Sequence, residues 1–108
     1  MSKLIYIYIT NPDIKVARRV ANLLLDKKLI ACANIFSGVE SIYPWKGKRV
    51  KEKEVVLVAK TTTEKYGTVK KLVEKNHPYA IPCIVKISVE ANAGYAKWLR
   101  ECLSEKSK

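Results

Sequence analysis

The order in which strand-type and helix-type patterns alternate along the chain is the feature that most limits its fold. β-Branched and aromatic residues fill four segments, as is typical of strands: Leu4–Ile9, Ala31–Tyr43, Val50–Ala59 and Cys83–Val89. Apolar residues at helical spacing follow the first and the third of these segments. The order β-α-β-β-α-β is the split-βαβ, ferredoxin-like plan, in which two helices cover one face of an antiparallel four-stranded sheet. We therefore predict an α+β chain with a single domain over residues 1–108.

The first helix is expected to begin at Asn11-Pro12-Asp13. Asn11 can cap a helix, Pro12 suits its first position, and Asp13 complements the helix dipole. Behind this start, one apolar stripe follows the i, i+3, i+4, i+7 spacing of an amphipathic helix: Ala17, Val20, Ala21 and Leu24. The pattern predicts a helix that packs with this stripe against the sheet.

Two further helices are expected in the second half of the chain. Thr61 followed by Glu64 matches a capping box, and Pro78 would end the helix that this box starts. Its apolar stripe consists of Tyr66, Val69, Leu72 and Val73. A short C-terminal helix is predicted from a stripe of Tyr95, Trp98, Leu99 and Cys102. The polar tail, Ser104–Lys108, is expected to fray.

The second and third strand segments are predicted to form one long hairpin. Ser37-Gly38 interrupts the first arm, and a glycine inside a strand usually marks a bulge. Lys46-Gly47-Lys48 is the expected turn. Each arm has about a dozen residues, whereas a usual strand has about five or six. Arms of this length can reach beyond the domain's own sheet.

The strand patterns also predict an oligomer. The split-βαβ plan leaves one sheet face without helices, and in a monomer that face should alternate to polar residues. Leu4–Ile9 is apolar on both faces, and so is the end of the third strand, Val55–Ala59. An exposed apolar face usually marks an interface, although the C-terminal helix could cover part of it.

Charge and cysteine content narrow the function classes. The net charge is +11, but the excess is mostly lysine spread along the chain, so nucleic-acid binding is not the expected role. Cys32, Cys83 and Cys102 stand alone in the sequence, which argues against a secreted disulfide framework. Met1-Ser2-Lys3 lacks the layout of a signal peptide, and the apolar run Leu4–Ile9 is too short to span a membrane. These features predict a cytoplasmic protein without a membrane segment.

Two residues are candidates for a metal site. His77, the only histidine, ends the second helix, and Cys83 follows six residues later as a soft ligand. The competing interpretation of His77 is a structural partner of the helix dipole. One histidine cannot hold a metal tightly by itself, so further ligands would have to come from a neighbouring subunit.

Three residues outside this pair are candidates for ligand binding. Tyr43 and Trp45 stand at the far end of the hairpin, where exposed aromatic side chains would suit a binding lip or an anchor between subunits. A small hydrophobic cluster under the turn is the alternative. Lys60 stands beside the start of the second helix, where it would suit an anion site. A solvated lysine is the alternative there.

Several short motifs resemble the CutA (divalent-cation tolerance) family. They are Thr10-Asn11-Pro12, Ala31-Cys32-Ala33-Asn34-Ile35, Gly38, Ser41-Ile42-Tyr43, Trp45, Gly47-Lys48, Lys60-Thr61-Thr62, His77-Pro78-Tyr79, Pro82 and Tyr95-Ala96-Lys97-Trp98-Leu99. The resemblance runs from about Ile5 to Leu103. It implies a ferredoxin-like fold and a homotrimer similar to the PII signalling proteins, with the long hairpin pairing with neighbouring subunits. It also implies a link to tolerance of copper and other divalent cations, with no obligatory cofactor and no assigned reaction.

The chain departs from the family at the positions described as copper ligands. The family has a Cys at the end of the first strand and a His pair before the proline, where this chain has Ile9, Asn76 and His77. The family commonly has Glu after the His-Pro-Tyr motif and after the next proline, where this chain has Ala80 and Cys83. Two oxygen ligands for a hard ion are therefore absent, and Cys83 would favour a soft ion such as Cu(I). The ligand site implied between subunits is lined by Tyr43, Trp45, Lys60 and His77.

Two other function classes share this fold. Acylphosphatases need an Arg-containing phosphate loop after the first strand, where this chain has Thr10–Asp13. A nucleic-acid-binding module needs aromatic side chains on the central strands, a place that Tyr6 and Tyr8 could fill. No Gly-rich phosphate loop or nucleophile–base set is present, so no catalytic residue is predicted.

Overall fold

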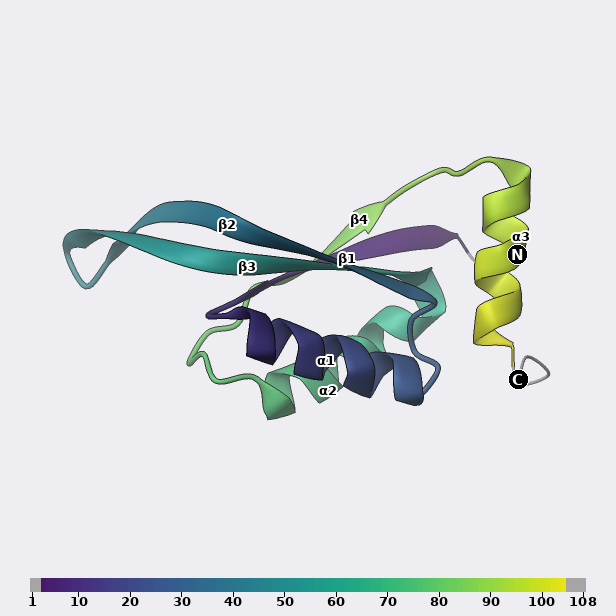
Figure 1. Cartoon of the computed structure of the whole chain (residues 1–108), viewed down its shortest axis with the longest axis horizontal. Coiled ribbons are helices and arrows are strands. Elements are labelled where there is room, and N and C mark those ends of the chain that lie inside the picture. The colour runs from purple at the N-terminus through teal and green to yellow at the C-terminus, as the bar shows by residue number, and fades with distance from the viewer. Residues whose placement is uncertain (1–2, 105–108) are drawn as a thin grey trace.

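Figure 1 shows the fold of the chain, taken from a computed structural model that describes residues 3–104. The expectations for Met1-Ser2 and for the tail beyond Ser104 lie outside the described residues. The elements follow in the order β1 (Leu4–Asn11), α1 (Ile14–Asp26), β2 (Cys32–Trp45), β3 (Lys48–Thr62), a 3₁₀ turn (Thr63–Lys65), α2 (Tyr66–Asn76), β4 (Ile84–Ser88) and α3 (Ala93–Leu103). This is the predicted β-α-β-β-α-β order with an added C-terminal helix.

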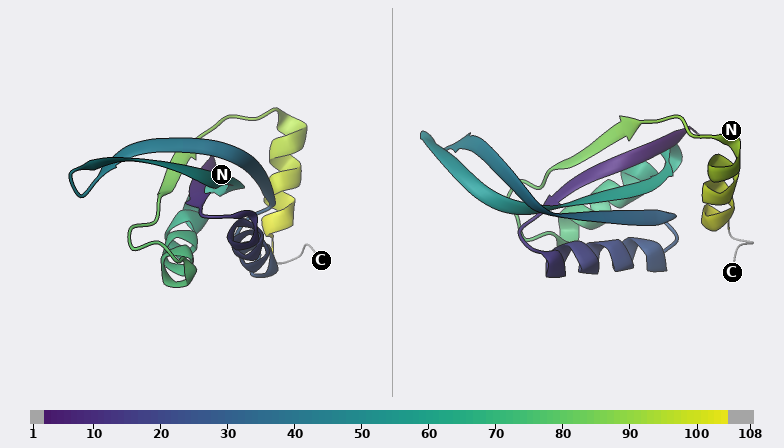
Figure 2. Two further views of the ribbon diagram at one scale, coloured as in Figure 1. Left: turned by 60° about the vertical axis from the view of Figure 1, so that its left-hand side comes forward. Right: turned by 45° about the horizontal axis from the view of Figure 1, so that its top comes forward.

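The four strands form one antiparallel sheet in the order β2-β3-β1-β4. Helices α1 and α2 lie side by side under one face of the sheet, and the opposite face carries no helix (Figures 1 and 2). Ile5, Ile7 and Ile9 of β1 point toward the helices and are almost completely buried. Since side chains alternate along a strand, Tyr6 and Tyr8 lie on the opposite face. The molecule is elongated, with extents of 48 × 25 × 22 Å.

The long hairpin is confirmed, and it extends past the rest of the sheet (Figure 1). Its two-residue turn, Lys46-Gly47, has positive φ at both positions, +51° and +78°. That is the type I′ pattern, whose twist matches the twist of the two strands. The pairing of β2 with β3 shifts between Phe36 and Val39, and Gly38 has φ +77° there. The predicted bulge is therefore present.

The predicted start of the first helix is wrong by two residues. Asp13, not Asn11, is the N-cap, and its carboxylate accepts a 2.8 Å hydrogen bond from the backbone N–H of Val16. Asn11 is instead the last residue of β1 and is completely buried. Its side-chain amide donates to the carbonyl oxygens of Ile9 and Val55 at 3.2 and 3.1 Å. The amide thus joins β1 to β3, a role that competes with helix capping.

The predicted capping box of the second helix is also absent. Thr61 lies inside β3, and its hydroxyl donates a 2.7 Å hydrogen bond to the carbonyl of Leu29. The sheet therefore continues three residues past the predicted end of the strand at Ala59. Thr63–Lys65 forms the 3₁₀ turn, and α2 begins only at Tyr66.

Helix α3 packs across the end of the sheet and does not lie over its open face (Figures 1 and 2). Its buried residues are Ala96, Leu99 and Leu103, which meet Leu4. The buried face of α3 is therefore rotated relative to the predicted stripe. Trp98 of that stripe is 45% exposed and packs beside Tyr95, with ring centroids 5.5 Å apart. In the part of the chain that the structure describes, no helix is long and apolar enough to cross a membrane.

Candidate functional site

The end of β1 holds the imidazole of His77 in a fixed orientation. Its Nε2 lies 2.9 Å from the carbonyl oxygen of Thr10 and 3.2 Å from Oδ1 of Asn11. Its Nδ1 accepts a 3.2 Å hydrogen bond from the backbone N–H of Tyr79. These partners assign the proton to Nε2, which donates to the Thr10 carbonyl. Both ring nitrogens are thus engaged within the chain.

The surroundings of His77 favour its neutral form. Burial lowers the pKa of His77 below its usual value, and the positive charge of Arg19 acts in the same direction. The hydrogen bond to Thr10 and the negative charge of Glu54 oppose this shift without reversing it. A neutral imidazole can keep the acceptor role that Nδ1 has here, whereas a doubly protonated ring would lose it. His77 therefore connects the segment after α2 to the end of β1.

A buried carboxylate lies next to this connection. Glu54 on β3 is only 8% exposed, and its Oε2 accepts a 2.7 Å hydrogen bond from the Tyr79 hydroxyl. The pKa of Tyr79 is raised far above its usual value. Burial is the largest cause, and the hydrogen bond to Glu54 and the charge of Glu54 add to it. Tyr79 therefore remains a donor to Glu54 throughout the physiological pH range.

The Glu54 carboxylate faces a pocket of about 360 Å³ where the hairpin leaves the body of the sheet. Val50, Glu52 and Glu54 occupy every second position of β3, so their side chains point to the same side of the strand. Tyr43 is the direct cross-strand partner of Val50, and Trp45 is two residues further along the same side. The complete lining consists of Thr10, Tyr43, Trp45, Val50, Glu52, Glu54, Tyr79, Ala80 and Ile81.

Cys83 lies close to the same strand end. Burial raises the pKa of the Cys83 thiol, and the charge of Glu54 raises it further, while a hydrogen bond with the Thr10 side chain acts in the opposite direction. Cys83 is a half-buried free thiol. Although His77 and Cys83 both adjoin Thr10, residues 3–104 contain no group of three or more His, Cys, Asp or Glu side chains that could hold a metal ion. A metal role for this pair stays a prediction.

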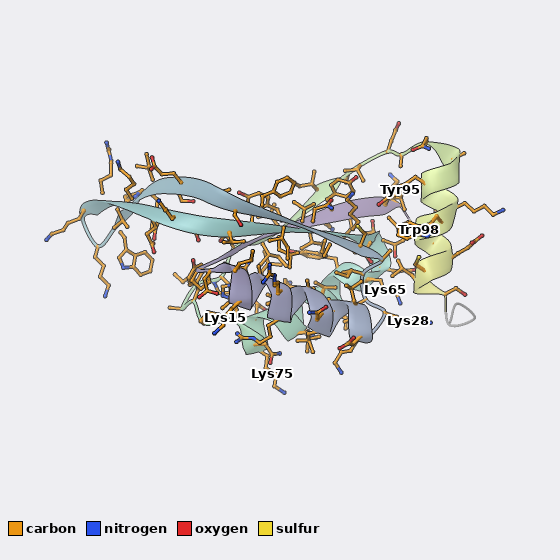
Figure 3. All side chains as sticks on the ribbon, viewed as in Figure 1. Lys15, Lys28, Lys65, Lys75, Tyr95 and Trp98 are labelled. Atoms are coloured by element: carbon orange, nitrogen blue, oxygen red, sulfur yellow. The ribbon has the colours of Figure 1, made fainter. Side chains whose placement is uncertain are left out.

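Lys60, the remaining predicted ligand residue, lies at the opposite end of β3. It is six positions along the chain from Glu54, which corresponds to about 20 Å along an extended strand. Its Nζ lies 5.2 Å from the ring centre of Tyr6 and 5.4 Å from that of Tyr95. Burial lowers the pKa of Lys60, but its interactions with Tyr95 and Tyr6 outweigh burial and raise it. Tyr95 is on α3, at the end of the sheet (Figure 3).

Of the four predicted ligand residues, the fold brings Tyr43 and Trp45 into one pocket, with His77 beside it and Lys60 remote from it. Glu54 and Tyr79 are not among the predicted site residues. Glu54 had one detectable signal: it immediately precedes the apolar run Val55–Ala59 and shares its strand face with Val56 and Val58. A charged residue in a buried register is a candidate for a functional site.

Two features bear on the other function classes. Within Thr10–Asp13, the stretch that an acylphosphatase would use for phosphate, Asn11 is buried as the last residue of β1 and its side chain connects β1 to β3. Lys15, Lys28, Lys65 and Lys75 lie around the helical layer and not on the open sheet face (Figure 3). Neither an acylphosphatase nor a nucleic-acid-binding module gains support from this geometry.

Comparison with known proteins gives one consistent family. The family model described as CutA1 divalent ion tolerance protein matches residues 5–102. The chain is 43% identical over 96 residues to the divalent-cation tolerance protein CutA of Thermus thermophilus, covering 88% of this chain and 93% of that protein.

Solved structures agree with this match. The CutA1 structure from Ehrlichia chaffeensis has a TM-score of 0.91 at 34% identity, covering 96% of this chain and 98% of that chain. The structure described as the periplasmic divalent cation tolerance protein CutA from Archaeoglobus fulgidus has a TM-score of 0.89 at 37% identity, covering 94% of this chain and 99% of that chain.

Proposed function

Because this chain belongs to the CutA1 divalent ion tolerance protein family, we propose that it is a non-enzymatic homotrimer in the response to divalent cations. A metal ion or a small ligand binds at clefts between its subunits. The observation that carries this proposal is the apolar sheet face that the chain itself leaves uncovered.

The open face is apolar on all four strands of the sheet. It is defined by Phe36, Val58, Tyr8, Val85 and Ile87. Phe36, Val85 and Ile87 are 53%, 47% and 45% exposed. The face does not alternate to polar residues, as a solvent-facing antiparallel sheet would. Helix α3 covers Leu4 at one end only. A second copy of the chain presents the same kind of surface, so association of identical subunits would remove all of these side chains from water.

An assembly also accounts for the distribution of the predicted ligand residues. Lys60 is about 20 Å along the strand from the pocket that contains Tyr43 and Trp45, so one chain cannot gather all of them around a small ligand. Likewise, the described part of one chain offers only His77 and Cys83 as neighbouring soft donors, and Zn²⁺ or copper sites need more. A neighbouring subunit is the source of the missing groups in this proposal.

Light scattering tests the assembly. The expected mass is three times the 12.3 kDa of the chain. Phe36→Glu places a charge on the open face and should release monomers, whereas Leu25→Glu on α1, at a residue that is 37% exposed, should leave the mass unchanged. A native protein that is monomeric at micromolar concentration would refute the oligomer.

Calorimetry tests the metal half of the proposal. Cu(II), Cu(I) and Zn(II) are titrated into the native protein and into His77→Ala and Cys83→Ala. The expected result is a weaker Cu(I) binding in Cys83→Ala, because a thiolate is the softest donor near the site. Heats that are identical in all three proteins would remove both residues as ligands.

We also propose a cytoplasmic location, supported by the three free thiols and the absence of a disulfide framework. The relative from Archaeoglobus fulgidus is described as periplasmic. Cell fractionation followed by immunoblotting decides between these compartments, and recovery of the protein outside the cytoplasm would refute the proposal.

A further inference from the structure

We propose that the pocket lined by Tyr43, Trp45, Tyr79 and Glu54, here called the hairpin pocket, binds a small organic ammonium ion in preference to a bare metal ion. This inference deepens the proposed function, because it names the chemical class of the ligand at the cleft where a small molecule is expected.

The charge of Glu54 has no compensating cation in the described part of the chain. The side chain is more than nine-tenths buried, and its only hydrogen bond in the described residues is the one from the Tyr79 hydroxyl to Oε2. No lysine or arginine of residues 3–104 forms an ion pair with it, although the chain carries a net charge of +11. Lys51 and Lys53 alternate with Glu52 and point to the other side of β3. Burying a carboxylate without a neighbouring cation costs free energy. Binding of a cation at the Glu54 carboxylate is therefore favoured.

Three aromatic side chains line the pocket together with the Glu54 carboxylate. Tyr43 and Trp45 come from β2, and Tyr79 comes from the segment after α2, so the three rings approach the pocket from two directions. The faces of such rings attract cations through their quadrupoles, and tryptophan does so most strongly. Aromatic cages recognise quaternary ammonium ligands in this way, and the Glu54 carboxylate would add an opposite charge to such a cage.

The size of the pocket and its few metal-binding groups favour an organic cation over a metal ion. At about 360 Å³ it is in the lower range of small-molecule sites and is far larger than a coordinated metal ion needs. A metal ion needs several oxygen, nitrogen or sulfur ligands at about 2.0–2.6 Å, and the described residues contain no group of three such side chains. Val50, Ala80 and Ile81 complete an apolar lining that suits the alkyl groups of an organic cation.

The test compares choline with 3,3-dimethyl-1-butanol, which has the same shape without the charge. Trp98→Phe leaves Trp45 as the single tryptophan, so that its fluorescence reports on the hairpin pocket of the assembled protein. Butylammonium serves as a second, smaller probe. We expect both cations to change the Trp45 emission in a saturable way and to bind about tenfold or more tightly than the neutral alcohol.

Matched variants identify the residues responsible. Glu54→Gln keeps an acceptor for the Tyr79 hydroxyl but removes the charge, and it should weaken choline binding about tenfold, to the level of the alcohol. Glu40→Gln makes the same charge change on the opposite side of the hairpin and should have no effect. If Glu54→Gln fails to fold, Tyr43→Leu should still weaken choline binding several-fold by removing one ring.

The outcomes separate this inference from the proposed function. If neither cation binds, if the alcohol binds as tightly as choline, or if Glu54→Gln binds choline normally, the ammonium site is refuted. Titration of Cu(II) and Zn(II) in the same protein is read independently. Metal binding without choline binding would overturn the ammonium site and leave the metal proposal standing. Choline binding without metal binding would support the ammonium site and overturn the metal proposal.

Discussion

The Tyr79 hydroxyl donates a 2.7 Å hydrogen bond to Oε2 of Glu54, which joins the segment after α2 to the middle of β3 across 25 residues of sequence. The imidazole of His77 strengthens the same connection by bonding to Thr10 on one side and to Tyr79 on the other. The hairpin pocket therefore has one wall from the hairpin and one from a segment that the polar contacts of His77 and Tyr79 hold in place.

The first prediction concerns the bond itself. Tyr79→Phe leaves the buried Glu54 carboxylate without its donor, so we expect a loss of about 1–3 kcal/mol in the free energy of unfolding. Urea denaturation at a fixed subunit concentration measures it. Tyr66→Phe is the matched control, because Tyr66 donates a 3.0 Å bond to the neutral carbonyl of Ile84, a bond worth about 1 kcal/mol. Equal losses in the two variants would show that the Glu54 charge adds nothing.

The second prediction concerns pH and His77. The folded state lowers the pKa of His77, so below the ordinary histidine pKa of 6.5 the unfolded chain binds the proton more readily than the folded one. Stability that is fully present above pH 6.5 should therefore decline as the pH falls through the folded pKa.

Urea denaturation at pH 7.5 and at pH 5.5 measures this decline. His77→Gln keeps hydrogen-bonding capacity but does not titrate, so its loss of stability between the two pH values should be smaller than that of the native protein. A variant with the same pH dependence as the native protein would assign the effect to other groups.

The third prediction concerns the hairpin turn. Lys46 has φ +51°, a left-handed conformation that asparagine tolerates better than lysine. Lys46→Asn creates the Asn-Gly pair preferred in type I′ turns and should stabilise the protein by about 0.5 kcal/mol. Gly47→Ala should destabilise it by about 1 kcal/mol, because φ is +78° there. The added methyl group would meet no neighbouring atom, so no steric clash adds to this cost. Thermal unfolding measures both, and a destabilised Lys46→Asn would contradict the type I′ assignment.

The fourth prediction concerns the reactivity of Cys83. Burial and the charge of Glu54 raise its thiol pKa above the ordinary 9.0, so the unreactive thiol form should dominate at neutral pH. Alkylation by iodoacetamide, followed residue by residue with mass spectrometry, should still be accelerating above pH 9.0 at this position.

The Glu54→Gln variant extends this test, since removing the negative charge should increase the alkylation rate of Cys83. Glu40→Gln is the control for a general change in charge and should leave the rate unaltered. Rapid alkylation of Cys83 at pH 7 in the native protein would show that the thiol is more accessible and more acidic than this environment implies.

Periodicity predicted the strands and helices, because it depends only on neighbouring residues. Leu4–Ile9 and Val50–Ala59 are found within strands, although β1 runs to Asn11 and β3 from Lys48 to Thr62. These longer strands account for both capping errors. Asn11 and Thr61 have good capping chemistry, but the sheet continues through them, and their side chains bond to carbonyls of other elements.

The stripe of α3 was displaced for a related reason. Helical spacing allows either the aromatic set that includes Tyr95 and Trp98 or the set of Ala96, Leu99 and Leu103. The second set faces Leu4 at the end of the sheet. The position of the helix, which no local pattern encodes, selected between them.

Local sequence patterns by themselves determined the element order, the long hairpin with its bulge and turn, and an uncovered apolar sheet face. Only the tertiary structure decided that Glu54 meets Tyr79, that both ring nitrogens of His77 are engaged, and that Lys60 lies far from Trp45. The physical reason is that backbone conformation follows from adjacent residues, whereas a polar site depends on which distant segments are brought within hydrogen-bonding distance.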